Sequence, residues 1–154
     1  MAELKDRLRT DLTAAMKARD GLRASTLRMA LSAISTAEVA GKQARVLNDE
    51  EVTAVLITEA KKRREAAHAF DEADRAELAA KERAEAEILA DYLPERLSDE
   101  ELAGLVDATV DRLGVGGSGM GAMGAVMGQL KPLVAGRADG AAVAALVRRR
   151  LASG

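Results

Sequence analysis

The sequence contains no cysteine and no tryptophan, and it has only one histidine, His68, one phenylalanine, Phe70, and one tyrosine, Tyr92. The absence of cysteine excludes disulfide bonds, thiolate metal sites and a cysteine nucleophile. With a single histidine, a zinc site would need carboxylates for nearly all of its ligands, and a Ser-His-Asp triad would have to use His68. The composition therefore predicts no catalytic residue, no metal and no cofactor for this chain alone.

Hydrophobic residues make up 48% of the 154 residues, although aromatic residues make up only 1%. The core must therefore be built from aliphatic side chains. The shortage of β-branched and aromatic residues favours helices over strands. No segment alternates between apolar and polar residues with a period of two, so we expect an all-α protein.

Apolar residues at spacings of three and four predict helices over residues 3–18, 22–39, 48–70, 71–92, 98–113, 118–130 and 139–151. Two of these helices have a clear start. Asn48 with Glu51, and Ser98 with Glu101, have the spacing of capping boxes. Periodicity leaves open whether the third and fourth helices are separate or form one rod.

Pro94 marks the expected boundary between two domains, because the residue before a proline is pushed away from helical geometry. We predict an N-terminal four-helix bundle of long helices over residues 1–93 and a compact three-helix C-terminal domain over residues 94–154. Within the second domain, Pro132 and Gly136 are expected to end the helix that precedes them.

The net charge of −2 hides an uneven distribution along the chain: residues 1–28 carry +3, residues 29–111 carry −10 and residues 112–154 carry +5. The basic ends either bind an anionic partner or pack on the acidic middle, and charge alone leaves both readings open. The longest uncharged stretch, residues 113–130, contains seven glycines and is too polar for a membrane span. Without a signal peptide or cysteine, we expect a cytoplasmic protein that does not bind membranes.

A glycine- and methionine-rich segment follows residue 119. Met123 and Met127 share one helix face, and Gly124 and Gly128 lie together at the same spacing. Glycine in a helix costs about 1 kcal/mol relative to alanine, so a compensating role is expected. One reading is a close helix–helix crossing in which methionine fills the gaps. The other is an interaction face on which a protein or RNA backbone approaches closely.

A cluster of basic residues lies near the end of the chain. Arg148, Arg149 and Arg150 are consecutive, so they fan out over much of the last helix. Together with Lys131 and Arg137 they form a candidate phosphate-binding patch. In the alternative reading, the three arginines only complement the dipole at the C-terminal end of that helix.

Several short segments occur in an order that is specific as a set: Thr26-Leu27-Arg28, Arg75-Ala76-Glu77-Leu78 with Glu82, Tyr92-Leu93-Pro94, Leu97-Ser98, Met123-Gly124-Ala125-Val126-Met127-Gly128 and Gly136-Arg137-Ala138-Asp139-Gly140. This set resembles the GatB/YqeY family over nearly the whole chain. The resemblance implies an N-terminal helical bundle joined to a small helical domain. That small domain is similar to the tail of the B subunit of tRNA-dependent amidotransferase, so residues 95–154 would be a tRNA-binding-type module.

The larger amidotransferase converts glutamate or aspartate mischarged on tRNA to the amide, with glutamine as nitrogen donor. This chain has no room for its catalytic cradle or for a glutaminase domain. Where the amidotransferase tail usually has a lysine after the second methionine, this chain has Gly128, and the usual Asn-Pro is replaced by Asp139-Gly140. Both changes remove charge or rigidity from the expected RNA face.

We therefore expect a stand-alone GatB/YqeY-type module that binds tRNA or tRNA-related machinery. It is related to the carbon–nitrogen ligase with glutamine as amido-N-donor, but it lacks the catalytic domains of that enzyme. The alternatives are an accessory module that binds a protein partner in translation through the Gly/Met face, and an amidotransferase-associated ligase activity. Because aromatic residues are scarce, RNA would be recognised through its phosphates and its shape, and DNA is not an expected partner.

Overall fold

The computed structural model describes residues 3–153, and within this range it contains helices and no strand, which confirms the predicted all-α fold. The elements are α1 (Glu3–Lys17), α2 (Gly21–Glu38), α3 (Asp49–Glu72), α4 (Ala76–Ala90), α5 (Asp99–Leu113), the 3₁₀-helix η1 (Met120–Ala122), α6 (Met123–Val134) and α7 (Gly140–Ser153). The chain forms two compact units, Met1–Pro94 and Glu95–Gly154.

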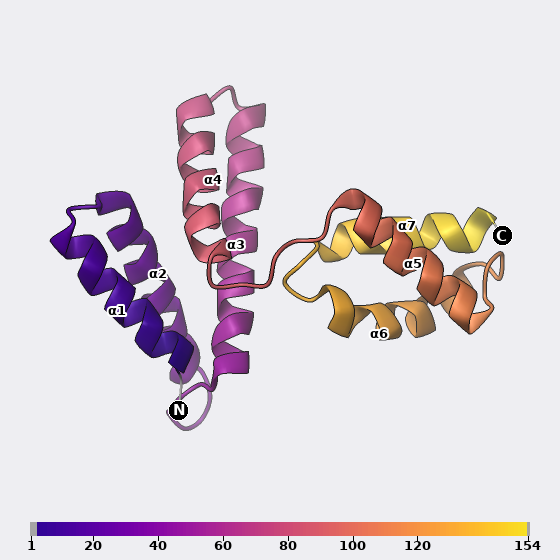
Figure 1. Cartoon of the computed structure of the whole chain (residues 1–154), viewed down its shortest axis with the longest axis horizontal. Coiled ribbons are helices and arrows are strands. Elements are labelled where there is room, and N and C mark those ends of the chain that lie inside the picture. Colours follow the sequence, from indigo (N-terminus) through magenta and orange to yellow (C-terminus); the bar gives the residue numbers. More distant parts are fainter. Residues whose placement is uncertain (1–2, 154) are drawn as a thin grey trace. The chain divides into compact units, whose positions relative to one another are not determined.

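The N-terminal unit consists of two antiparallel helical hairpins, α1 with α2 and α3 with α4 (Figure 1). One core joins all four helices. Its buried members are Leu8, Leu27, Ala30, Ile34, Leu47, Val52, Leu56, Ala60, Ile88, Leu89 and Tyr92. Each large aliphatic side chain buried in this way contributes roughly 1.5–3 kcal/mol, so the aliphatic core expected from the composition is sufficient to hold the hairpins together.

Both predicted capping boxes are present. Asn48 Oδ1 accepts a hydrogen bond from the backbone N–H of Glu51 (2.9 Å), and Glu51 Oε1 accepts one from the backbone N–H of Asn48 (3.2 Å). Ser98 and Glu101 make the same reciprocal pair over 3.1 and 3.0 Å. These bonds hold the pKa of the Glu101 carboxyl below its usual range, mainly through the Ser98 backbone N–H.

Two helix ends in this unit use a left-handed residue that is not glycine. Arg19 follows α1 with a φ of 58°, and Asp74 follows α3 with a φ of 57°. After Arg19 the backbone N–H of Asp20 bonds to the carbonyl of Ala15 over 2.9 Å, as in a Schellman motif. The same reversal at Asp74 makes α3 and α4 two separate helices, which settles the question that periodicity left open.

Tyr92 connects α1 to the segment that follows α4. Its hydroxyl donates a hydrogen bond to Asp11, and the guanidinium of Arg7 lies 4.6 Å from the centre of its ring. Burial, and next the hydrogen bond to Asp11, raise the pKa of the Tyr92 phenol well above its usual value. The only tyrosine of the chain therefore has a structural role in the N-terminal unit.

A charged cluster lies between α3 and α4. The Arg63 guanidinium is 3.3 Å from Glu59, 3.5 Å from Glu85 and 4.0 Å from Glu82. These side chains are between 9% and 19% exposed. Burial, and next the charge of Glu82, raise the pKa of the Glu85 carboxyl. Arg63 thus compensates several partly buried carboxylates, and the charged face of the hairpin depends on it.

The C-terminal unit packs α5, α6 and α7 around its own core of Leu102, Val106, Val110, Val126, Leu130, Val134, Val143, Val147 and Leu151. The backbone N–H of Gly119, just before η1, bonds to the carbonyl of Leu151 over 3.2 Å. The beginning of α6 therefore lies near the end of α7, and the two helices run antiparallel (Figure 1). Contrary to the prediction, α6 continues through Pro132 as far as Val134.

Candidate nucleic-acid interface

The α6 helix has two different faces. Val126, Leu130 and Val134 are buried in the core of the C-terminal unit. Met123 and Met127 are partly buried against the same core. Gly124 and Gly128 are exposed. With about 100° of rotation per residue, the glycines lie opposite Val126 and Leu130, so the helix turns bare backbone to solvent.

This arrangement corrects one of the two readings of the Gly/Met segment. A Cβ atom added to Gly124 or Gly128 would meet no other atom within 4 Å. Close helix–helix packing at these glycines is therefore wrong, because their side of α6 has no neighbouring helix in the part of the chain that the structure describes. The other reading, an interaction face formed by Gly124, Gly128, Met123 and Met127, stays a prediction.

Pro132 gives this face a further property. A proline has no backbone N–H, so it cannot donate the helical hydrogen bond to the carbonyl four residues earlier. That carbonyl belongs to Gly128, which is exposed. The glycine face thus presents a backbone acceptor that lacks the helical donor expected at this position.

Arg150 makes ion pairs with α5 at the surface of the unit. Its Nε donates to Asp107 Oδ1 over 2.7 Å, and its Nη2 donates to Asp111 Oδ1 over 2.9 Å. Both carboxylates belong to α5, so Arg150 joins α7 to α5. The guanidinium has two carboxylate partners already, which makes it a poor candidate for contact with a phosphate.

Arg137 also has a partner inside the unit. Its Nε donates to the backbone carbonyl of Glu95 over 2.9 Å, and its own carbonyl accepts from the N–H of Leu97 over 2.8 Å. These two bonds hold the segment before α5 against the segment between α6 and α7. Arg137 therefore positions the beginning of the unit, and only part of its guanidinium faces solvent.

Lys131, Arg148 and Arg149 are the remaining predicted cations, and all three are exposed. Within residues 3–153, none of them has a carboxylate oxygen within 4.0 Å. Their charge is therefore not neutralised by a carboxylate of residues 3–153, in contrast to that of Arg150.

Helix geometry brings two of these cations to one side of the unit. Gln129 of α6 accepts from Arg112 of α5 over 3.4 Å, which marks the flank of α6 that faces α5. Lys131 is two residues further on, about 200° around the axis, and lies on the flank toward α7. By the same argument, Arg148 lies on the flank of α7 opposite Arg150, toward α6. We call Gly124, Gly128, Lys131 and Arg148 the α6–α7 patch.

Arg149 projects from another side of α7, about 100° from Arg148.

The sequence analysis treated the five cations as one group. It did not identify the hydrogen-bond partners that set Arg137 and Arg150 apart from the other three. Asp107 and Asp111 are four residues apart on α5 and so share a face, but nothing in the sequence links that face to Arg150.

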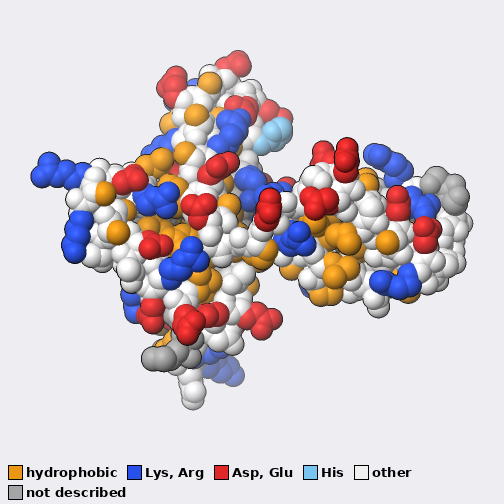
Figure 2. Space-filling model, viewed as in Figure 1, with side chains coloured by type: hydrophobic (Ala, Val, Ile, Leu, Met, Phe, Trp, Pro, Cys, Tyr) orange, Lys and Arg blue, Asp and Glu red, His pale blue; other side chains and the backbone are white. Residues whose placement is uncertain are grey.

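The described residues also bear on whether the chain has a metal site or a membrane span. No three His, Cys, Asp or Glu residues among residues 3–153 are placed to bind one metal ion. None of the helices in that range has the length and apolar character needed to cross a membrane. On the face shown in Figure 2, acidic and basic side chains are interspersed over the N-terminal unit.

The comparison with known families decides what kind of protein this is. A sequence profile described as Yqey-like protein matches residues 5–151. The chain belongs to the Yqey-like family. The match spans both units, so the family covers the N-terminal hairpins as well as the C-terminal unit. A Schizosaccharomyces pombe protein described as uncharacterized is 38% identical over 92 residues, which are 60% of this Yqey-like chain and 73% of that protein.

Proposed function

We propose that this Yqey-like protein is a non-catalytic module that binds structured RNA, with tRNA as its main ligand, through the α6–α7 patch. The observation that carries this proposal is that Lys131 and Arg148 are exposed on one flank, without a carboxylate partner in the described chain, beside exposed glycine backbone. Unneutralised cations beside bare backbone allow a phosphodiester chain to approach closely.

The charge distribution of the C-terminal unit supports this side as the RNA side. Helix α5 has five acidic residues and one basic residue, whereas residues 120–153 have five basic residues and one acidic residue. The two sides of the unit therefore carry opposite charge: carboxylates predominate on α5, and cations predominate on α6 and α7. A polyanion is attracted to the α6–α7 side and repelled by the other.

The scarcity of aromatic residues is consistent with recognition of RNA through its phosphates and its shape. The two aromatic residues, Phe70 and Tyr92, both lie in the N-terminal unit, and Tyr92 is buried. The C-terminal unit therefore has no ring on which an unpaired base could stack. Double-stranded RNA is recognised mainly through its shape, its phosphates and its 2′-hydroxyls, which need no aromatic side chain.

The choice of tRNA among structured RNAs rests on the resemblance of residues 95–154 to the tail of the amidotransferase B subunit. Because Gly128 stands where that tail usually has a lysine, we expect weaker binding than an amidotransferase tail shows. With few free cations, the dissociation constant should lie in the range of about 10⁻⁶ to 10⁻⁴ M that is typical of non-specific contacts.

The test is a tRNA titration of the full chain, followed by fluorescence anisotropy at 50 mM salt. Substituting Lys131→Gln and Arg148→Gln together should raise the dissociation constant at least about tenfold, because two phosphate contacts are lost. The matched control is Lys42→Gln with Lys81→Gln, which removes the same charge from exposed positions in the N-terminal unit. Equal losses in both variants would show that only net charge matters and would reject the patch.

A second candidate function is the binding of a protein partner in translation on the same face of α6. The exposed glycines favour it, because a partner helix could approach the backbone of α6 where no Cβ intervenes. If the parent chain does not bind tRNA at 50 mM salt, this function takes precedence. Substituting Gly124→Leu should then abolish the complex and leave the fold intact, since the added side chain points into open space.

A further inference from the structure

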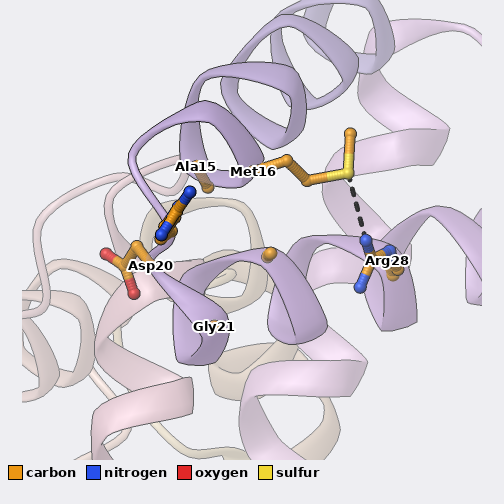
Figure 3. A pocket seen from close by; sticks show the side chains of 7 residues that line it. Ala15, Met16, Asp20, Gly21 and Arg28 are labelled. Atoms are coloured by element: carbon orange, nitrogen blue, oxygen red, sulfur yellow. Dashed lines mark hydrogen bonds between the residues drawn. The ribbon is translucent and has the colours of Figure 1, made fainter.

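A shallow hollow lies in the N-terminal unit, where α1 ends and α2 begins (Figure 3). Its volume is about 340 Å³, and two arginines, Arg19 and Arg28, contribute to its lining. The rest of the lining is small or apolar apart from Asp20. This volume is at the lower end of the range of about 300–1,000 Å³ in which small-ligand sites fall.

Arg28 contacts a neutral side chain instead of a carboxylate among the residues that the structure describes. Its Nη2 donates to the thioether sulfur of Met16 over 3.0 Å, and no carboxylate oxygen lies within 4.0 Å in residues 3–153. Figure 3 shows Met16 extending from α1 toward Arg28 on α2. A thioether is a weak acceptor, whereas a guanidinium has five N–H donors. The contact with Met16 therefore steadies Arg28 and leaves most of its donors available.

Arg19 is the second cation of the hollow. It is exposed and, like Arg28, has no carboxylate oxygen within 4.0 Å in the described part of the chain. Its neighbour Asp20 is already engaged by Arg23, whose backbone N–H lies 3.1 Å from Oδ1 and whose Nε lies 3.7 Å from Oδ2. Arg23 thus offsets the one carboxylate of the hollow, and the charges of Arg19 and Arg28 remain.

We propose that this hollow binds a phosphate group between the guanidinium groups of Arg19 and Arg28. A planar guanidinium can donate two parallel hydrogen bonds to phosphate oxygens, and two of them from different elements can hold one phosphate from both sides. Gly21 and Ala24, which also line the hollow, have no long side chain that would fill it. The site lies in a different unit from the α6–α7 patch and does not depend on the proposed function.

The phosphate could belong to a small phosphorylated compound or to an RNA backbone, and the chemistry of recognition is the same. The hollow contains no aromatic ring and no amide side chain with which to read a base. Recognition would therefore depend on the phosphate and not on the nucleoside.

The first test titrates the full chain carrying Lys131→Gln and Arg148→Gln with inorganic phosphate, at constant ionic strength maintained with chloride. Amide and arginine Nε–Hε resonances are followed by NMR. Saturable shifts are expected in residues 15–28. Substituting Arg19→Gln and Arg28→Gln together should weaken binding at least tenfold. Arg28→Lys keeps the charge, removes the planar fork and should weaken binding by a smaller factor.

Lys17→Gln is the matched control, because Lys17 is exposed beside the hollow but does not line it. It should leave the affinity within twofold of the starting variant. A second titration uses a 12-base-pair RNA duplex. Shifts of the same resonances with RNA assign the phosphate to a nucleic acid, and shifts with inorganic phosphate alone assign it to a small compound. Absence of saturable shifts with both probes, or an equal loss in Lys17→Gln, would overturn the proposal.

Discussion

Arg150 of α7 lies 2.7 Å from Asp107 of α5, measured from Nε to Oδ1, and the same guanidinium reaches Asp111 over 2.9 Å. The three consecutive arginines of α7 therefore differ in role, although they look equivalent in the sequence. Arg150 holds two helices together. Arg148 and Arg149 face solvent without a carboxylate partner in the described chain.

Substituting Arg150→Gln should lower the free energy of unfolding by about 1 kcal/mol, the upper range for ion pairs that are partly open to solvent. Arg148→Gln should change it by less than about 0.5 kcal/mol, since it alters an exposed side chain without partners. Urea unfolding of both variants measures the difference. Equal stability of the two variants would contradict the division of roles.

Gly128 offers a gain-of-function test. Substituting Gly128→Lys should stabilise the protein by about 0.5–1 kcal/mol, because lysine is the better helix former and its Cβ meets open space. The new charge lies on the α6–α7 patch. One additional phosphate contact should tighten tRNA binding by about five- to eightfold at 0.1 M salt.

The control for that variant is Gly104→Lys. Gly104 is exposed within α5, and its added Cβ would likewise meet nothing within 4 Å. This variant should gain similar stability and carry the same net charge, but the lysine lies on the acidic helix. If Gly104→Lys tightens tRNA binding as much as Gly128→Lys does, the patch has no positional role.

Arg63 should be the most sensitive charged residue of the N-terminal unit. Substituting Arg63→Met leaves the partly buried Glu82 and Glu85 without Arg63, whereas Glu59 keeps its ion pair with Lys62 at 3.1 Å. We expect a loss of about 2–3 kcal/mol at pH 7, somewhat below the roughly 3–5 kcal/mol of fully buried pairs because the cluster is partly open to solvent. The loss should shrink as the pH falls toward 5, since protonation removes the repulsion. A deficit that grows on acidification would be inconsistent with this account.

The pH dependence of stability expected for Glu85→Gln is opposite in direction to that of Arg63→Met. The pKa of the Glu85 carboxyl is raised in the folded state by burial and by Glu82. The parent therefore loses stability from this group as the pH rises through the folded-state pKa. The unfolding free energy of Glu85→Gln relative to the parent should rise between pH 4 and pH 7. Paired urea titrations across this range measure it, and a relative stability that falls with pH would be the contrary result.

The left-handed residues at two helix ends give a prediction about backbone conformation. Arg19→Gly and Asp74→Gly should each stabilise the N-terminal unit by about 0.5–1 kcal/mol, since relief of left-handed strain exceeds the added entropy of the unfolded chain. Only Arg19→Gly should also weaken the binding of phosphate. Thermal unfolding together with the phosphate titration separates these effects, and loss of stability in both variants would show that neither residue is strained.

Local signals predicted the fold well. The capping pairs at Asn48 and Ser98 form as expected because both partners lie within one helical turn. The break between α3 and α4 was not predictable in this way. It depends on Asp74 adopting a left-handed conformation, for which the sequence has no glycine to signal it.

The site was predicted less well, because it depends on contacts between helices. Spacing showed that Gly124 and Gly128 share a face, but it left open whether that face packs against a helix or is an interaction face. The buried stripe of Val126, Leu130 and Val134 lies opposite, and it already occupies the side of α6 that faces the core. The commitment of Arg150 to α5 is a long-range contact, so a run of three arginines could not reveal it.

The salt dependence of tRNA binding tests the central claim most directly. The association constants of the parent and of the Lys131→Gln, Arg148→Gln variant are measured between 50 and 300 mM KCl. The two cations of the patch should give the parent a log–log slope of about −1.4 to −1.8, at about 0.7–0.9 for each phosphate contact. The variant should have a slope that is shallower by about 1.4–1.8. Equal slopes for the two proteins would contradict RNA binding through the α6–α7 patch.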